Sequence, residues 1–98
     1  MLFERCVYME KIILSRVVCT KNNKTMLVFL KGVSSSSTKV KGYNENIQWF
    51  DDLDIFNKLE QSDFGVLVDA ELGYSEPNYQ GLCTLEIKQL ISKGRKII

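Results

Sequence analysis

The sequence contains no histidine, one proline and three cysteines among its 98 residues. Histidine is the commonest general base and the commonest metal ligand, so its absence argues against enzymes and metal proteins. We therefore expect a protein without catalytic activity, metal or cofactor. Long hydrophobic runs are missing too, because the longest, Met26–Leu30, has five residues and a membrane-spanning helix needs roughly 20. With no signal-like N-terminus, we expect a soluble, cytoplasmic protein.

The three cysteines are Cys6, Cys19 and Cys83, an odd number without any Cys-x-x-Cys spacing. All three lie in apolar, strand-like stretches. This pattern argues against a zinc ribbon and against a disulfide scaffold. We interpret them as small core residues in a reducing compartment.

Composition is that of one ordinary globular domain, with 45% hydrophobic and 26% charged residues over residues 1–98. The net charge of +1 conceals a division along the chain. Residues 1–48 hold eight basic and three acidic residues, residues 49–92 hold two basic and nine acidic, and residues 93–98 add three basic. A normally solvated surface accounts for such asymmetry by itself, and an electrostatic partner is the alternative.

Three strands are predicted in the first half. Residues 7–20 are rich in β-branched and aromatic side chains and predict a long strand, bent or bulged. The polar residues 21–24 predict a turn into a second strand at 25–31. The serine run within residues 32–38 predicts a mobile basic loop, and alternating residues at 43–50 predict a third strand.

A helix and two strands are predicted in the second half. Asp51 and Asp52 are candidate N-caps of a helix ending near Ser62, with Leu53, Ile55, Phe56 and Leu59 on its apolar face. Residues 64–72 alternate as a strand, with Phe64, Val66, Val68, Ala70 and Leu72 facing inward. Turn-forming residues at 73–81 precede a last strand at 82–88. Residues 89–98 are expected to be a frayed extension or a basic tail.

This order of elements is mainly β and matches a five-stranded Greek-key barrel of the OB type, with one helix between strands three and four. Another small α+β barrel or roll is the alternative. SH3-like barrels lack a helix at that point, and a ferredoxin-like fold needs a helix after its first strand.

The stretch from Lys24 to Lys88 resembles the small single-stranded-DNA-binding proteins of bacteriophages and conjugative plasmids, in part the filamentous-phage group. The similar features are Leu27 and Phe29 on the second strand, a basic loop, Tyr43 on the third strand, an alternating fourth strand, and a tyrosine-bearing turn that leads into residues 81–85. The strong helix points to helix-containing relatives. The resemblance implies a DNA-binding protein of the bacterial cytoplasm that coats strands during DNA replication or transfer, with a homodimer as one form.

Sequence-tolerant binding of single strands needs cations for the phosphates and exposed aromatic rings for the bases. The candidate cations are Arg16, Lys21, Lys24, Lys31, Lys39 and Lys41. The candidate stacking residues are Phe29, Tyr43, Trp49, Tyr74 and Tyr79. Each of these rings has a structural alternative, in the core for Phe29 and Trp49, in sheet packing for Tyr43, and in anchoring a turn for Tyr74 and Tyr79. The serines at 34–37 are better interpreted as a linker than as phosphate ligands.

The acidic segment would repel nucleic acid, so in this interpretation it faces away from the binding groove. Its members are Asp51, Asp52, Asp54, Glu60, Asp63, Asp69, Glu71 and Glu76. The alternative function is a small protein-interaction module or phage-encoded inhibitor that uses this acidic face on a basic partner. A metal-dependent nuclease built from Glu86, Lys88 and Asp69 or Glu71 is much less favoured, because alternating surface charges produce such spacings by chance.

Overall fold

The computed structural model describes residues 9–32 and 41–98. The strands are β1 (Glu10–Cys19), β2 (Thr25–Gly32), β3 (Tyr43–Phe50), β4 (Leu67–Tyr74), β5 (Leu85–Ser92) and β6 (Arg95–Lys96), and the helices are α1 (Asp54–Lys58) and a single 3-10 turn at Gln61–Asp63. The predicted serine loop from residue 33 onward, Lys39 and Cys6 lie outside the described residues.

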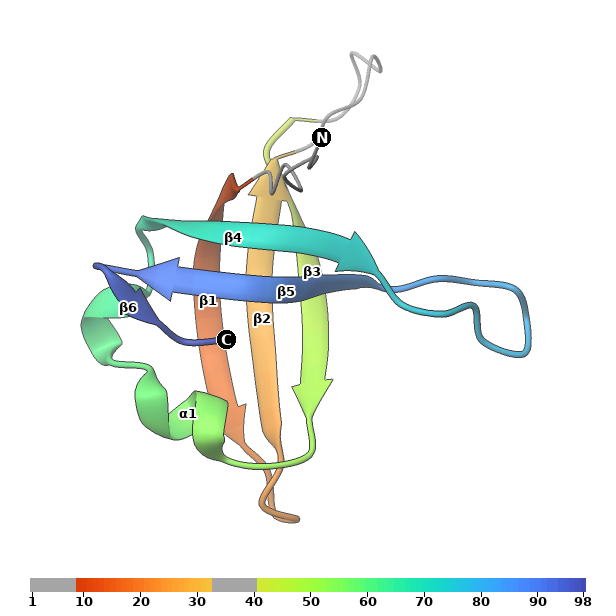
Figure 1. The fold of residues 1–98 in the computed structure, drawn as a ribbon, viewed down its shortest axis with the longest axis horizontal. Coiled ribbons are helices and arrows are strands. Elements are labelled where there is room, and N and C mark those ends of the chain that lie inside the picture. Colours follow the sequence, from red (N-terminus) through yellow and green to blue (C-terminus); the bar gives the residue numbers. More distant parts are fainter. Residues whose placement is uncertain (1–8, 33–40) are drawn as a thin grey trace, which may run out of the picture.

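The strands form one antiparallel sheet in the order β3-β2-β1-β4-β5-β6. Figure 1 shows β4 and β5 crossing in front of β1, β2 and β3, so the folded sheet makes two layers. Strands β3 and β5 are not paired by backbone hydrogen bonds in the described part of the chain. They do approach each other, because the Ile87 N–H donates to Gln48 Oε1 at 2.7 Å. The prediction of a mainly β fold with a helix between strands three and four is confirmed. The sheet has six strands, not five, and does not close.

The first strand is bulged, as predicted. Its register on β2 shifts between Leu14 and Arg16. Ile12 and Leu14 are buried before the shift, and Val17 packs against the core after it. The predicted turn into β2 is also confirmed, because Asn23 has a φ of 58°, a left-handed conformation that asparagine tolerates.

The core lies between the two layers, and β2 runs through its centre. Leu27 and Phe29 on β2 are fully buried. The other buried members of this cluster are Ile12, Leu14, Ile55, Val68, Ala70, Ile87, Leu90 and Ile97. Ile55 is the buried residue of α1, which lies beside the end of the layer nearest the β1–β2 turn (Figure 1).

The helix predicted over residues 51–62 is much shorter in the structure. It spans Asp54–Lys58, and Leu59 is already extended with a φ of −86° and a ψ of 143°. Asp52 does accept a hydrogen bond from the Asp54 N–H at 3.1 Å, but the N-cap position belongs to Leu53. The chain leaves the helix because Asp63 is bound outside it. The Asp63 carboxylate accepts a hydrogen bond from the Glu60 N–H at 2.7 Å and another from Arg95 in the C-terminal segment.

The fourth strand begins later than predicted. Val68 and Ala70 are buried as expected, and Phe64 packs partly against the core from outside the strand. Val66 is 46% exposed, so the prediction that its side chain faces inward was wrong. Gly65, with a φ of 77°, turns the chain there while its N–H donates to the Leu14 carbonyl at 3.0 Å.

The prediction of a frayed tail at 89–98 was wrong. Lys93 and Gly94 both have positive φ and reverse the chain, so that β6 returns along the end of β5. Ile97 is 1% exposed, and its N–H donates to the Leu90 carbonyl at 2.8 Å. The last residues are therefore an integral part of the core.

The prediction of buried cysteines was wrong for both described ones. Cys19 and Cys83 are free and exposed. Cys19 ends β1 beyond the bulge, and Cys83 lies in the β4–β5 hairpin before β5 begins, so neither reaches the core. No helix within residues 9–32 and 41–98 has the length and apolarity needed to cross a membrane.

Candidate nucleic-acid interface

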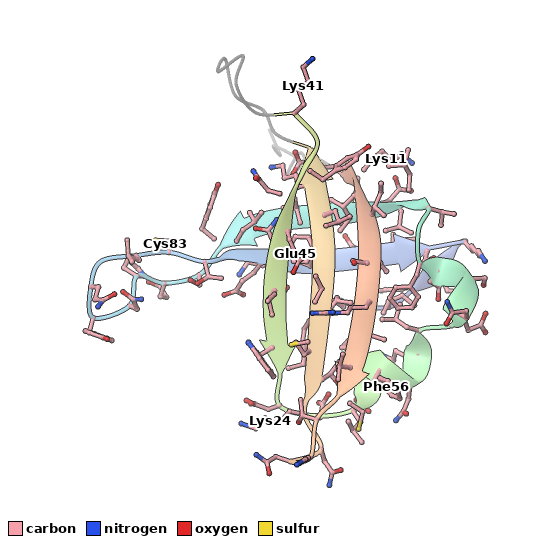
Figure 2. All side chains as sticks on the ribbon, turned by 180° about the vertical axis from the view of Figure 1, so that it is seen from behind. Lys11, Lys24, Lys41, Glu45, Phe56 and Cys83 are labelled. Carbon is pink, nitrogen blue, oxygen red and sulfur yellow. The ribbon has the colours of Figure 1, made fainter. Side chains whose placement is uncertain are left out.

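The layer of β1, β2 and β3 has one face that no other described element covers, and Figure 2 shows this face toward the viewer. Cross-strand neighbours point to the same side of a sheet, so the register assigns its members. Trp49 lies opposite Met26, which lies opposite Val18; Ile47 lies opposite Val28, which lies opposite Arg16. We call this the outer sheet face, and it comprises Ile13, Arg16, Val18, Met26, Val28, Leu30, Tyr43, Glu45, Ile47 and Trp49.

Two aromatic rings stand exposed on the edge strand of this face. Tyr43 is 59% exposed and Trp49 is 60% exposed, with Ile47 between them at 41%. Strand alternation turns Phe50 the other way, where it packs against the core. An exposed indole and phenol on one sheet face can stack on nucleic-acid bases.

Phe29 does not belong to this face, so its predicted role in stacking was wrong. It is fully buried between the two layers with Leu27. Val28, between them on β2, takes the outer position, where Arg16 and Ile47 flank it. Alternation along β2 placed Phe29 and Val28 on opposite sides, and packing against β4 and β5 decided which side is interior.

The predicted cations surround the outer sheet face unevenly. Arg16 is exposed and lies on the face itself. Lys24 and Lys41 lie at opposite ends of the three strands (Figure 2), and Lys21 lies in the turn next to Lys24. Within the described part of the chain, Arg16, Lys21 and Lys41 form no ion pair, whereas Lys24 Nζ is 3.6 Å from an oxygen of Asp51.

Lys31 lies on the opposite side of β2, because it shares the parity of Phe29. Its Nζ is 3.6 Å from Glu10 Oε1. It lines a groove of about 350 Å³ where the end of β2 and β3 approach the β4–β5 hairpin. We call this the edge groove, and its lining residues are Lys31, Gly32, Asn44, Asn46, Tyr74, Cys83 and Leu85.

The two hairpin tyrosines lie away from the outer sheet face. Tyr74 ends β4, is 68% exposed and lines the edge groove. Tyr79 is 94% exposed in the hairpin, which projects past β3 in Figure 1. The structure therefore separates the predicted aromatic set into one pair on the outer sheet face, one ring at the edge groove, one free ring and one core ring.

The acidic residues do not all lie on one surface. Asp69 pairs with Lys11 at 2.5 Å, and Glu86 pairs with Lys88 at 3.3 Å. Asp51, Asp52 and Asp54 lie beyond the end of β3, where they line a cavity with Lys58 and Lys96. Glu45 is the one carboxylate among the residues of the outer sheet face.

Asp63 is fully buried and so cannot contribute to an acidic binding surface. Burial by itself would raise the pKa of this carboxyl. Hydrogen bonds from Arg95, from the Ser92 hydroxyl and from the Glu60 N–H outweigh burial and lower the pKa to about 2. Asp63 therefore stays ionised as the centre of a structural network.

Comparisons with protein-family models, curated proteins and solved structures gave no match. Within residues 9–32 and 41–98, no group of three or more cysteine or carboxylate residues is placed to hold a metal ion. What the described site offers is aromatic surface and unpaired positive charge.

Ile47, Asn44 and Asn46 are among the residues of the two surfaces that the sequence patterns did not predict. Ile47 could have been found, because it shares the parity of Tyr43 and Trp49 on a predicted strand. Asn44 and Asn46 share the other parity, but only the approach of the hairpin makes a groove around them. No local pattern signals that approach.

Proposed function

We propose that this protein binds single-stranded nucleic acid with little sequence preference on the outer sheet face. Trp49 and Tyr43 stack on bases, and Arg16, Lys21, Lys24 and Lys41 contact phosphates along the strand. Binding of this kind needs no catalysis and no cofactor.

The main support for the proposal is the exposure of Trp49. The only tryptophan of the chain is 60% exposed on an uncovered sheet face, with a tyrosine at the other end of the same strand. Large aromatic residues are normally drawn into cores, and a row of exposed ones marks an interaction surface. Arg16, two strands away on that face, supplies the cation that distinguishes a nucleic-acid surface from a purely apolar one.

The OB-type architecture belongs to the same proposal. It is supported by the helix between β3 and β4, by the pairing of β1 with both β2 and β4, and by the approach of β5 to β3. Ligands of OB folds use the face of strands two and three and the adjoining loops. We extend the proposal to a phage or mobile-element protein of the bacterial cytoplasm that coats strands, with a homodimer as one form.

The test is fluorescence anisotropy of labelled oligo-dT and of the matching duplex at about 50 and 200 mM salt. We expect salt-sensitive binding to the single strand and weaker binding to the duplex. Trp49→Ala is expected to weaken binding about tenfold, because stacking of one base contributes roughly 1–3 kcal/mol.

Trp49→Phe is the matched control, since it keeps a stacking ring at the same position, and it should bind much more tightly than Trp49→Ala. Failure of the wild-type protein to bind at low salt would refute the proposal. The alternative of an acidic docking face draws less support, because Lys24 pairs with Asp51, and Lys58 and Lys96 line the same cavity as Asp52.

A further inference from the structure

The edge groove is chemically unlike the outer sheet face. It holds two carboxamides, Asn44 and Asn46, one ammonium group, Lys31, and the ring of Tyr74. No carboxylate side chain is among its described lining residues. Its volume of about 350 Å³ falls within the range of small-molecule sites, roughly 300–1,000 Å³.

These groups match the parts of a nucleotide. A carboxamide both donates and accepts hydrogen bonds, so it can pair with the edge of a base. Asn46 uses one donor locally, since its Nδ2 donates to the Asn44 carbonyl at 3.3 Å, and its amide oxygen is an acceptor. The exposed ring of Tyr74 offers a stacking surface, and Lys31 offers a charge for phosphate.

The position of the groove connects it to the outer sheet face. Tyr43 and Asn44 are neighbours on the edge strand, and alternation turns them to opposite faces. A nucleic-acid strand that crosses this edge therefore meets the Tyr43 ring on one side and the edge groove on the other.

We infer that the edge groove is a nucleotide subsite, in which Asn44 and Asn46 hydrogen-bond the base, Tyr74 stacks on it and Lys31 contacts its phosphate. The inference rests on the proposed function, because it continues the strand path around the edge of β3. A phosphate entering the groove would compete with Glu10 for Lys31, whose Nζ lies 3.6 Å from that carboxylate.

Cys83 supplies a direct test, because its exposed thiol lines the groove (Figure 2 labels it on the hairpin). We would measure the alkylation rate of each cysteine by peptide mass spectrometry with the four deoxynucleoside monophosphates as probes. Cys19 is the internal control, since it is exposed at the opposite end of the β1–β2 pair from the groove. We expect monophosphates to slow alkylation of Cys83 severalfold and to leave Cys19 unchanged.

Asn46→Asp keeps the shape of the side chain and removes its amide donor, and Asn44→Ala removes the other carboxamide. Each should raise the monophosphate concentration that gives half-maximal protection of Cys83 about tenfold, the effect of losing one good base contact. Asn57→Ala is the matched control, because Asn57 is exposed on α1 and absent from the groove lining. Circular dichroism of every variant checks that it is folded.

The outcomes separate the two proposals. Protection of Cys83 that Asn46→Asp weakens about tenfold and Asn57→Ala preserves would support the subsite, whether or not oligo-dT binds. Unchanged alkylation of Cys83 at saturating monophosphate would overturn the subsite. Oligo-dT binding in anisotropy, measured on the same samples, would then still support the outer sheet face.

Discussion

One guanidinium nitrogen of Arg95 lies 2.7 Å from both carboxylate oxygens of Asp63. The carboxylate is fully buried, and the Ser92 hydroxyl donates to it at 2.6 Å. Arg95 also donates through its other terminal nitrogen to the Lys58 carbonyl at 3.0 Å. The pair therefore ties the C-terminal strand to the end of α1 and to the 3-10 turn.

The first prediction concerns loss of this pair. Arg95→Met should destabilise the fold clearly, because it leaves the buried Asp63 carboxylate without its counter-charge. Urea unfolding followed by Trp49 emission measures the change. Lys96→Met, one residue further and exposed, should change stability by less than about 0.5 kcal/mol. Equal effects of the two substitutions would contradict the structural role of Arg95.

The second prediction concerns pH. The pKa of Asp63 is about 2 in the folded protein and about 3.8 for an ordinary aspartate. A lowered folded-state pKa means that the stabilisation is complete above about pH 4 and is lost as the pH falls toward 2. We expect a loss of about 1–2 kcal/mol over that window, less than the full shift implies because Arg95 is partly exposed to screening solvent.

Unfolding midpoints measured at intervals from pH 5 to pH 2 test this, with the interval set by the pKa window. Asp63→Asn should be less stable at neutral pH and should lose less stability on acidification. Asp54→Asn, an exposed aspartate on α1, is the control and should follow the wild-type profile. A wild-type profile in Asp63→Asn would show that another carboxyl governs acid stability.

The third prediction separates core from surface on neighbouring strands. Phe29→Ala should cost about 3–5 kcal/mol of stability, because it opens a cavity between the layers. Tyr43→Ala, at a 59% exposed position, should cost little stability but should weaken oligo-dT binding. Thermal unfolding and anisotropy on the same two variants measure both effects. Normal stability of Phe29→Ala would place Phe29 outside the core.

The fourth prediction concerns the salt dependence of binding. Each phosphate contact on a single strand contributes about 0.7 to the slope of log affinity against log salt. Arg16→Gln and Lys41→Gln should each reduce the slope by about that amount, and Lys96→Gln, on β6, should not. Anisotropy titrations across a salt series give the slopes. An unchanged slope in Arg16→Gln would remove Arg16 from the phosphate path.

Local sequence patterns located most of the strands because turn chemistry and period-two alternation act over a few residues. The asparagines at 22–23 mark the first turn, and alternation from Tyr43 to Phe50 marks β3 with its observed bounds. The bulge in β1 was also visible, because apolar residues occur on both parities of a strand too long to lie flat.

The helix and the C-terminus were mispredicted because long-range contacts decide them. Leu59 fits an apolar helical face, yet the chain becomes extended there while Asp63 bonds Arg95, 32 residues away. The charged residues at 93–96 suggested a solvated tail, whereas the positive φ of Lys93 and Gly94 turns Ile97 into the core.

The sequence by itself determined the mainly β character, the position of the helix and the alternation that separates Phe29 from Val28 and Trp49 from Phe50. These features depend on neighbouring residues alone. Only the tertiary structure decided which member of each pair faces the core between the layers, because the second layer of β4 and β5 covers one side of the first and leaves the other uncovered. Because of the same layering, Phe29 lies in the core and Trp49 is exposed. The β4–β5 hairpin also lies beside Asn44, where it forms the edge groove.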